Sequence, residues 1–217
     1  MKIMCDDLQY LIHFFNDREH LFKTITMVES CQIDEICNKI SSQNGWHSGR
    51  FSPSERHYYL NRRLFVENEL YEGYARVYGH LKESVPVYFY LFPNITKQKA
   101  IQLAQQRTRY GEIKPQVLMV RIQDIDDTKN ITFTLNDSFT AYLKKAMDSG
   151  IKRREEEKDH VVLQDHNKVF PFSMIEQLHW KYQAQEIYYE VQIWDYDLLE
   201  KIRYAVLGEE EMRSNGF

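Results

Sequence analysis

Over residues 186–193, mainly apolar side chains alternate with mainly polar ones, and this segment constrains the fold more than any other. The two sets of positions are Ile187, Tyr189, Val191 and Ile193 on one side and Glu186, Tyr188, Glu190 and Gln192 on the other. Successive side chains of a β-strand point to opposite faces of a sheet, so this pattern predicts a half-buried strand. The chain is therefore expected to contain a β-sheet with one face against an apolar core.

Helices and further strands are predicted around this strand. Helices are expected at residues 6–25 (one helix or two short ones), 27–40, 55–78, 96–110 and 138–147. Short apolar runs predict strands at residues 85–92, with Pro86 at the beginning, 116–122 and 131–135. Residues 41–54 are expected to form a loop and residues 197–204 a turn or short helix.

No linker or internal repeat divides the chain of 217 residues. Ser/Gly-rich and Pro-rich stretches are absent from the sequence, and so are repeats with a period of about 20–50 residues. A chain of this length suits one domain and can bury roughly 70% of the surface that it exposes when unfolded. Residues 1–217 are therefore predicted to form a single α+β domain.

Composition and charge argue against several classes of protein. The longest apolar run, residues 85–92, spans eight residues and contains Pro86, whereas a membrane helix needs about twenty. The N-terminus lacks an apolar signal core, and Cys5, Cys31 and Cys37 have no metal-binding spacing. We therefore expect a reduced, cytoplasmic protein with no bound metal and no membrane partner. The net charge is −4, so any nucleic-acid contact requires a local basic patch.

Several common catalytic motifs are missing. The sequence contains no GxGxxG or GxxxxGK[ST] motif, which would cradle phosphates, and no GxSxG motif, which would present a serine nucleophile. The eight histidines form no HExxH or HxH motif, and His160, His166 and His179 are too loosely spaced to define a metal site. An obvious kinase or hydrolase is therefore disfavoured.

Residues 46–63 are locally basic and rich in aromatic rings. The segment contains a single acid, Glu55, together with Trp46, Arg50, Phe51, Arg56, Tyr58, Tyr59, Arg62 and Arg63. Guanidinium groups beside aromatic rings suit a ligand that carries phosphates and stackable rings. The alternative is that the arginines form ordinary surface pairs, for example Arg63 with Glu67 at i,i+4.

Glu190 is the second candidate for chemistry, because it lies inside the alternating strand. If its face of the strand is in plain solvent, a glutamate there needs no special explanation. If that face lines a cleft, Glu190 is a carboxylate held on a rigid strand, as a catalytic group should be.

Several segments, taken in order, resemble the DarT-type ADP-ribosyltransferases. Residues 85–89 (VPVYF) closely match the family's VPFYF strand, and residues 189–194 are similar to the strand that bears its glutamate. Weaker matches are residues 10–15 to the opening element, 61–63 to the arginine-bearing helix, 114–120 to a later strand and 133–137 to the FVFTD element. The resemblance covers residues 13–204. Phe15 stands where the family has threonine, and Glu83 and Ser84 replace a His-Asp pair.

The resemblance implies an ADP-ribosyltransferase-like fold, with a split β-sheet core and N-terminal helices. It implies an enzyme that uses NAD as a substrate and transfers ADP-ribose to a base of DNA or RNA. Such enzymes are toxins of toxin–antitoxin or phage-defence systems, so an antitoxin partner is expected. By the same resemblance, Glu190 is catalytic, Arg63 or Arg62 holds the NAD phosphates, His13 orients NAD, and Phe15 or Tyr88 stacks on nicotinamide.

The segment that precedes the glutamate strand is expected to meet the acceptor. Residues 152–185 are predicted to form a loop that binds nucleic acid by charge and stacking, through Lys152, Arg153, Arg154, His166, Lys168 and Trp180. The alternative is a merely solvated loop, because the positive and negative charges of residues 152–159 cancel.

Two other functions remain open from the sequence. A protein-modifying enzyme or an NAD glycohydrolase could use the same fold. A non-catalytic module that binds nucleic acid or protein could also keep the fold, but it would have no need for a carboxylate at Glu190 beside Arg62 and Arg63.

Overall fold

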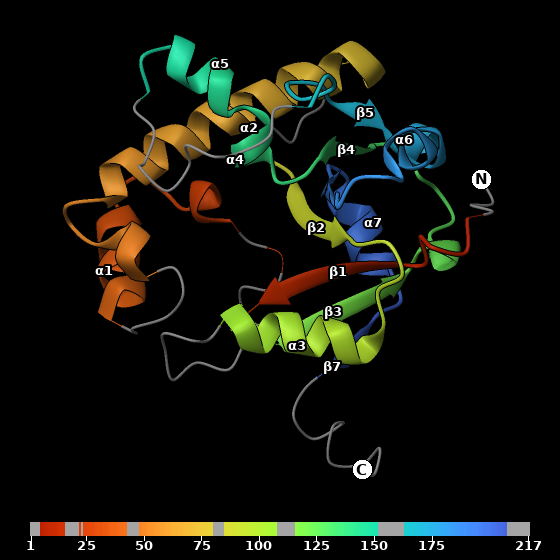
Figure 1. The fold of residues 1–217 in the computed structure, drawn as a ribbon. Coiled ribbons are helices and arrows are strands. Elements are labelled where there is room, and N and C mark those ends of the chain that lie inside the picture. Colours follow the sequence, from red (N-terminus) through yellow and green to blue (C-terminus); the bar gives the residue numbers. More distant parts are fainter. Residues whose placement is uncertain are drawn as a thin grey trace.

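The computed structural model describes residues 5–15, 22, 24–42, 48–79, 85–107, 116–151 and 163–207. Seven strands form one antiparallel sheet with helices packed against it, which confirms the α+β class (Figure 1). The strands are β1 (Tyr10–Phe15), β2 (Val87–Leu91), β3 (Gln116–Arg121), β4 (Ile131–Leu135), β5 (Phe170–Pro171), β6 (Tyr189–Ile193) and β7 (Ala205–Leu207). Their order across the sheet is β5-β4-β6-β2-β1-β3-β7.

Seven α-helices accompany the sheet in the described residues. They are α1 (Ile33–Ser42), α2 (Arg56–Tyr78), α3 (Lys97–Arg107), α4 (Ser138–Ala141), α5 (Leu143–Asp148), α6 (Ile175–Tyr182) and α7 (Tyr196–Lys201). The predicted helices at residues 55–78 and 96–110 are confirmed as α2 and α3, and that at 138–147 divides into α4 and α5. None of the helices that the structure describes is long and apolar enough to cross a membrane.

The first part of the helix predicted at residues 6–25 is wrong. Residues 10–15 form β1, which pairs with β3 along its whole length, and residues 16–21 and 23 lie outside the described residues. Leu11, Ile12 and Phe15, which are all buried, have a spacing that suits a helix face. The same spacing suits a strand that is covered on both faces, and pairing with β3 decides between the two.

Strand β6 is buried on both faces, whereas the sequence predicted burial on one. All five residues from Tyr189 to Ile193 are buried. The strand lies between β2 and β4, with Tyr90 and Thr134 directly opposite Glu190 on either side. Residues that are directly opposite share a face of the sheet, so Tyr90, Thr134 and Glu190 point the same way. The face of Glu190 is therefore not open to solvent.

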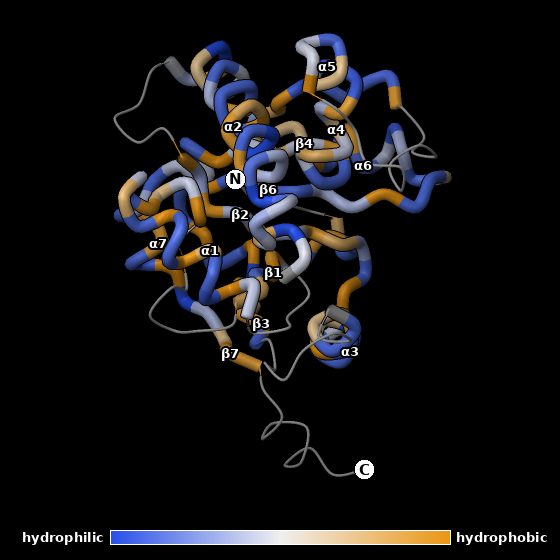
Figure 2. Tube along the Cα trace, turned by 90° about the vertical axis from the view of Figure 1, so that its left-hand side faces the viewer, coloured by the Kyte–Doolittle hydropathy of each residue, from blue (hydrophilic) through white to orange (hydrophobic). Residues whose placement is uncertain are grey.

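That face is covered by two helices that form separate apolar clusters. Helix α3 packs through Ala100 and Ala104 onto Ile12 and Met119. Helix α2 packs its own apolar residues, Val66, Leu70 and Tyr74, against Tyr88 and Trp194. Both hydrophilic and hydrophobic residues occur along α2 (Figure 2). The opposite face of the sheet carries the main core, which includes residues of α6 and α7.

The sheet is loosely joined between β1 and β2. Within the described residues these strands pair at a single position, Ile12 opposite Tyr90, whereas β1 and β3 pair at six. Beside that position the Nδ1 atom of His13 lies 2.7 Å from the carbonyl oxygen of Tyr88, in place of a backbone partner. The two halves of the sheet therefore separate next to β2, which carries Tyr88.

Gly73 lets α2 approach the segment before β5. A Cβ atom at this position would lie 2.3 Å from Cγ2 of Val169, closer than non-bonded carbons can come. We expect Gly73→Ala to lower the free energy of unfolding by about 1–3 kcal/mol through overpacking, measured by urea denaturation. Gly49→Ala is the control, because a Cβ there meets nothing within 4 Å. Equal stability of the two variants would contradict the close approach.

Candidate functional site

Glu190 is the second residue of β6, and its side chain is surrounded by protein. The residue is 3% exposed. Its Oε1 atom accepts a hydrogen bond from the backbone N–H of Ser138 at 3.2 Å, at the start of α4. The side-chain amide of Gln192 lies 3.5 Å from the same oxygen. The carboxylate is therefore fixed by the strand that carries it and by the first turn of α4.

Arg63 reaches the same region from α2. Its guanidinium carbon lies 3.9 Å from the centre of the Tyr88 ring, which is on the face of the sheet that carries Glu190. Its Nε atom donates to Oε1 of Glu67 at 2.7 Å, and the Tyr88 hydroxyl donates to the same oxygen at 3.3 Å. The i,i+4 pair that the sequence offered as an alternative is thus present. It is not a surface pair, because Glu67 is 4% exposed.

The charged groups of this cluster shift one another's pKa values. Burial raises the pKa of Glu190 to about 7; Arg63 opposes this rise and Asp137 adds to it. Burial also disfavours the charge of Arg63, but Tyr88, Glu67 and Glu190 outweigh it and hold the pKa of Arg63 above its usual value. Glu190 and Arg63 therefore act on each other electrostatically, and Glu190 can gain or lose its proton near neutral pH.

The N-cap and first turn of α4 also belong to this cluster. The sequence had given no predicted role to these residues. Asp137 caps this helix by accepting from the backbone N–H of Thr140 at 2.9 Å, and it also accepts from the Tyr188 hydroxyl at 3.0 Å. Phe139 places its ring 5.5 Å from the guanidinium carbon of Arg63. An Asp-Ser pair directly after a predicted strand is a typical N-cap signal and could have marked this position.

Arg62 has a different environment from its neighbour. It is 2% exposed, and its guanidinium donates to the backbone oxygen of Phe139 at 2.7 Å and to the Tyr58 hydroxyl at 3.2 Å. The bond to Phe139 ties α2 to α4, and the bond to Tyr58 lies within α2. Of the two arginines proposed for NAD, the structure brings Arg63 to Tyr88 and into the field of Glu190, and it uses Arg62 to join two helices.

His13 and Phe15 lie on the other face of the sheet from Glu190. Ile12 is opposite Tyr90, so the alternate residues of β1 point away from that face. The His13 ring lies 5.2 Å from the Phe89 ring, and Phe15 belongs to the main core. Of the residues predicted to bind the cofactor, Tyr88 contacts Arg63, and His13 contacts the Tyr88 carbonyl from the other face of the sheet.

The residues predicted to contact the acceptor are described only in part. Lys152, Arg153 and Arg154 lie outside the described residues. His166 is 5% exposed, and Lys168 forms an ion pair of 2.7 Å with Asp165. Trp180 presents an exposed ring. Residues 163–185 also include β5 and α6, so this part of the expected loop is structured.

Asp165 is the centre of its own buried network. Its carboxylate accepts from Lys168, Lys181 and the Tyr182 hydroxyl. Burial disfavours the charge of Asp165, but hydrogen bonds from these three groups outweigh it and hold its pKa well below the usual range. Lys168 is thus engaged in an ion pair with Asp165, which Lys181 and Tyr182 of α6 also contact.

Comparison of the chain with models of known protein families gives no match. Comparisons with curated proteins and with solved structures give no match either.

Proposed function

We propose that the protein is an NAD-dependent ADP-ribosyltransferase with an ADP-ribosyltransferase-like fold that modifies a base of DNA or RNA. The observation that carries this proposal is the buried cluster in which Glu190 and Arg63 act on each other's charge beside Tyr88. The loose join between β1 and β2, next to Tyr88, supports a split sheet of the kind that the family resemblance implies. As a toxin in the cytoplasm, such an enzyme would be paired with an antitoxin.

The reaction breaks the bond between nicotinamide nitrogen and ribose C1′, and nicotinamide leaves with the bonding electron pair. Positive charge develops on the ribose, as it does in glycoside hydrolysis. The carboxylate of Glu190 stabilises that charge by electrostatic attraction. The acceptor base nitrogen then bonds to C1′ and releases a proton, which Glu190 accepts as a general base. A group with a pKa of about 7 is suited to this step.

Arg63 is the residue proposed to hold the NAD diphosphate. A guanidinium can make two parallel hydrogen bonds to phosphate oxygens. In the structure, the Nε–H of that guanidinium donates a hydrogen bond to Glu67. Since Glu190 is 3% exposed, substrate entry requires covering side chains to move. The Phe139 ring is among the groups nearest to Arg63.

The proposed role of Glu190 predicts a pH dependence. Transfer needs the ionised carboxylate, which is the minor form below a pKa of about 7 and the major form above it. We expect kcat at saturating NAD to rise about 10-fold between pH 6 and pH 8 and then to level off. The measurement is nicotinamide release at a series of pH values. A flat profile over this range would contradict titration of Glu190 in the reaction.

The direct test is incubation of the protein with NAD and a mixture of DNA, RNA and protein. We expect mass analysis to find a single ADP-ribose on a nucleic-acid base, with one nicotinamide released for each adduct. An adduct on protein, or release of nicotinamide without an adduct, would replace the proposed acceptor by a protein or by water. Absence of nicotinamide release from NAD would reject the enzyme proposal.

A non-catalytic binding module is the second candidate. The observation that favours it is the pairing of Arg63 with Glu67, which already compensates the charge of the arginine. This candidate predicts binding of nucleic acid or protein with no consumption of NAD. Expression should then be harmless, whereas the proposed transferase should be toxic to the cell in the absence of its antitoxin.

A further inference from the structure

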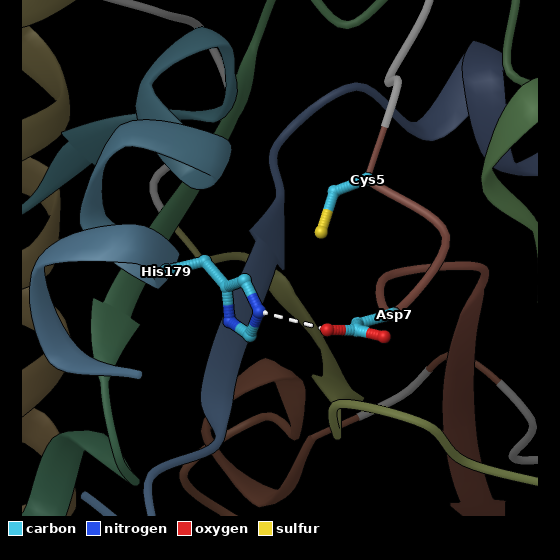
Figure 3. Close-up of side chains that lie close together, drawn as sticks. All are labelled: Cys5, Asp7 and His179. Atoms are coloured by element: carbon cyan, nitrogen blue, oxygen red, sulfur yellow. Dashed lines mark ion pairs between the residues drawn. The ribbon is translucent and has the colours of Figure 1, made fainter. Parts of the chain in front are cut away.

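Three side chains of metal-binding types meet on the far side of the sheet from Glu190. The sulfur of Cys5, a carboxylate oxygen of Asp7 and a ring nitrogen of His179 all lie within 4.8 Å of one another. Figure 3 shows the sulfur, the carboxylate and the imidazole turned toward one shared space. Cys5 and Asp7 come from the N-terminal turn before β1, and His179 comes from α6. Sequence spacing predicted no metal site, because His179 is far along the chain from Cys5 and Asp7.

The distances are close to those of a zinc centre. Zinc binds sulfur at about 2.3 Å and nitrogen or oxygen at about 2.0–2.2 Å, which places neighbouring ligand atoms of a tetrahedron roughly 3.3–3.6 Å apart. The Nε2 atom of His179 lies 3.5 Å from Oδ2 of Asp7. A movement of the Cys5 sulfur by roughly 1 Å would therefore complete three corners of a tetrahedron.

The surroundings hold the three donors in position. The Nδ1 atom of His179 lies 3.3 Å from the Tyr189 hydroxyl, which leaves Nε2 directed at Asp7. Metal-binding histidines usually hold their second nitrogen in this way. The backbone N–H of Cys5 donates to Oε1 of Glu176 at 2.9 Å, and the carbonyl of Asp7 accepts from the N–H of Asn94 at 2.7 Å. Cys5 is 8% exposed and His179 is 6% exposed.

We propose that Cys5, Asp7 and His179 form a zinc site with three protein ligands. A thiolate with an imidazole selects zinc over the hard cations magnesium and calcium. One Zn²⁺ bound by these residues leaves a fourth position for water. The ion would tie the N-terminal turn to α6, and through the His179–Tyr189 contact it would brace β6, the strand that carries Glu190.

The first test is zinc binding by the full chain, stripped of metal, in competition with a chromophoric chelator. We expect one Zn²⁺ per chain. At a free zinc concentration of 100 times Kd, we expect the melting temperature to rise by about 5–10 °C. Cobalt substitution should give the spectrum of a tetrahedral site with a thiolate-to-cobalt charge-transfer band.

Variants distinguish this site from adventitious binding. Cys5→Ser should abolish the charge-transfer band, and Asp7→Asn should weaken zinc binding at least about 100-fold. Asp7→Asn is informative because this side chain is 42% exposed, so its loss should not unfold the protein. Tyr189→Phe should weaken binding about 10- to 100-fold by releasing Nδ1 of His179. Cys31→Ser is the matched control, since Cys31 is an exposed cysteine outside the cluster.

The proposal would be overturned if the native chain bound zinc no more tightly than the Cys5→Ser variant. It would also be overturned by a cobalt complex that lacks the thiolate band. Neither outcome depends on ADP-ribosyl transfer, because both readouts measure metal binding and stability alone.

Discussion

Replacement of Glu190 by glutamine is expected to reduce ADP-ribosyl transfer by about 100- to 10,000-fold and to leave the fold intact. Glutamine has almost the shape of glutamate, and its carbonyl oxygen can still accept from the N–H of Ser138. It has no negative charge to stabilise the ribose cation and cannot take the proton of the acceptor. The measurement is adduct formation at saturating NAD, with Glu186→Gln, an exposed position before β6, as the control.

The same variant has a second expected effect, on stability. Burial raises the pKa of Glu190 from 4.5 to about 7, so ionisation is harder in the folded chain than in the unfolded chain. As pH rises through this interval, the native protein loses up to about 3 kcal/mol of stability that Glu190→Gln keeps. Urea denaturation should therefore show the variant to be more stable than the native protein at pH 8 and equally stable at pH 4.

The two effects of Glu190→Gln separate catalysis from folding. If the variant is more stable at pH 8 but still transfers ADP-ribose at the native rate, Glu190 has no role in the mechanism. Its burial would still be supported by that result. A variant that is inactive and less stable at pH 8 would show that the carboxylate is needed for packing.

Replacement of Arg63 by alanine is expected to raise the KM for NAD about 10- to 100-fold, since a charge-assisted hydrogen bond to a phosphate contributes about 1.5–3 kcal/mol. The change also leaves the carboxylate of Glu67 buried without its cation, at a cost of about 3–5 kcal/mol in the free energy of unfolding. Steady-state kinetics and urea denaturation measure the two effects.

The double variant Arg63→Ala/Glu67→Gln tests the role of Arg63 without leaving the Glu67 carboxylate buried and unpaired. We expect it to recover most of the lost stability and to keep the raised KM. Arg76→Ala, an exposed arginine of the same helix, is the control for the loss of a positive charge. An unchanged KM in the double variant would move the phosphate-binding role to Arg62 or to another residue.

Local sequence patterns were sufficient for most of the secondary structure. The apolar positions of α2 and α3 recur at helical spacing, and the short runs at β2, β3 and β4 are bounded by polar segments. The pattern failed at β1, because the spacing of Leu11, Ile12 and Phe15 fits a helix face as well as a doubly covered strand. Only pairing with β3 excludes the helix, and the partner lies about 100 residues away.

The candidate site, too, could be predicted only in part from local sequence patterns. The alternation around Glu190 identified its strand, but the burial of the face that carries Glu190 depends on α2 and α4, which local pattern cannot reveal. The donors of the proposed zinc site carry no sequence signal at all. Cys5 meets α6 through a hydrogen bond between residues 171 positions apart.

The sequence by itself determined an α+β chain, the strand that carries Glu190 and two candidate arginines on one helix. Only the tertiary structure shows how the surroundings of those arginines differ. Neighbouring residues of an α-helix point about 100° apart, so Arg62 and Arg63 leave α2 in different directions, although both reach Phe139. The docking of α2 on the sheet turns Arg63 toward Tyr88 and Glu190 and turns Arg62 toward the backbone of Phe139.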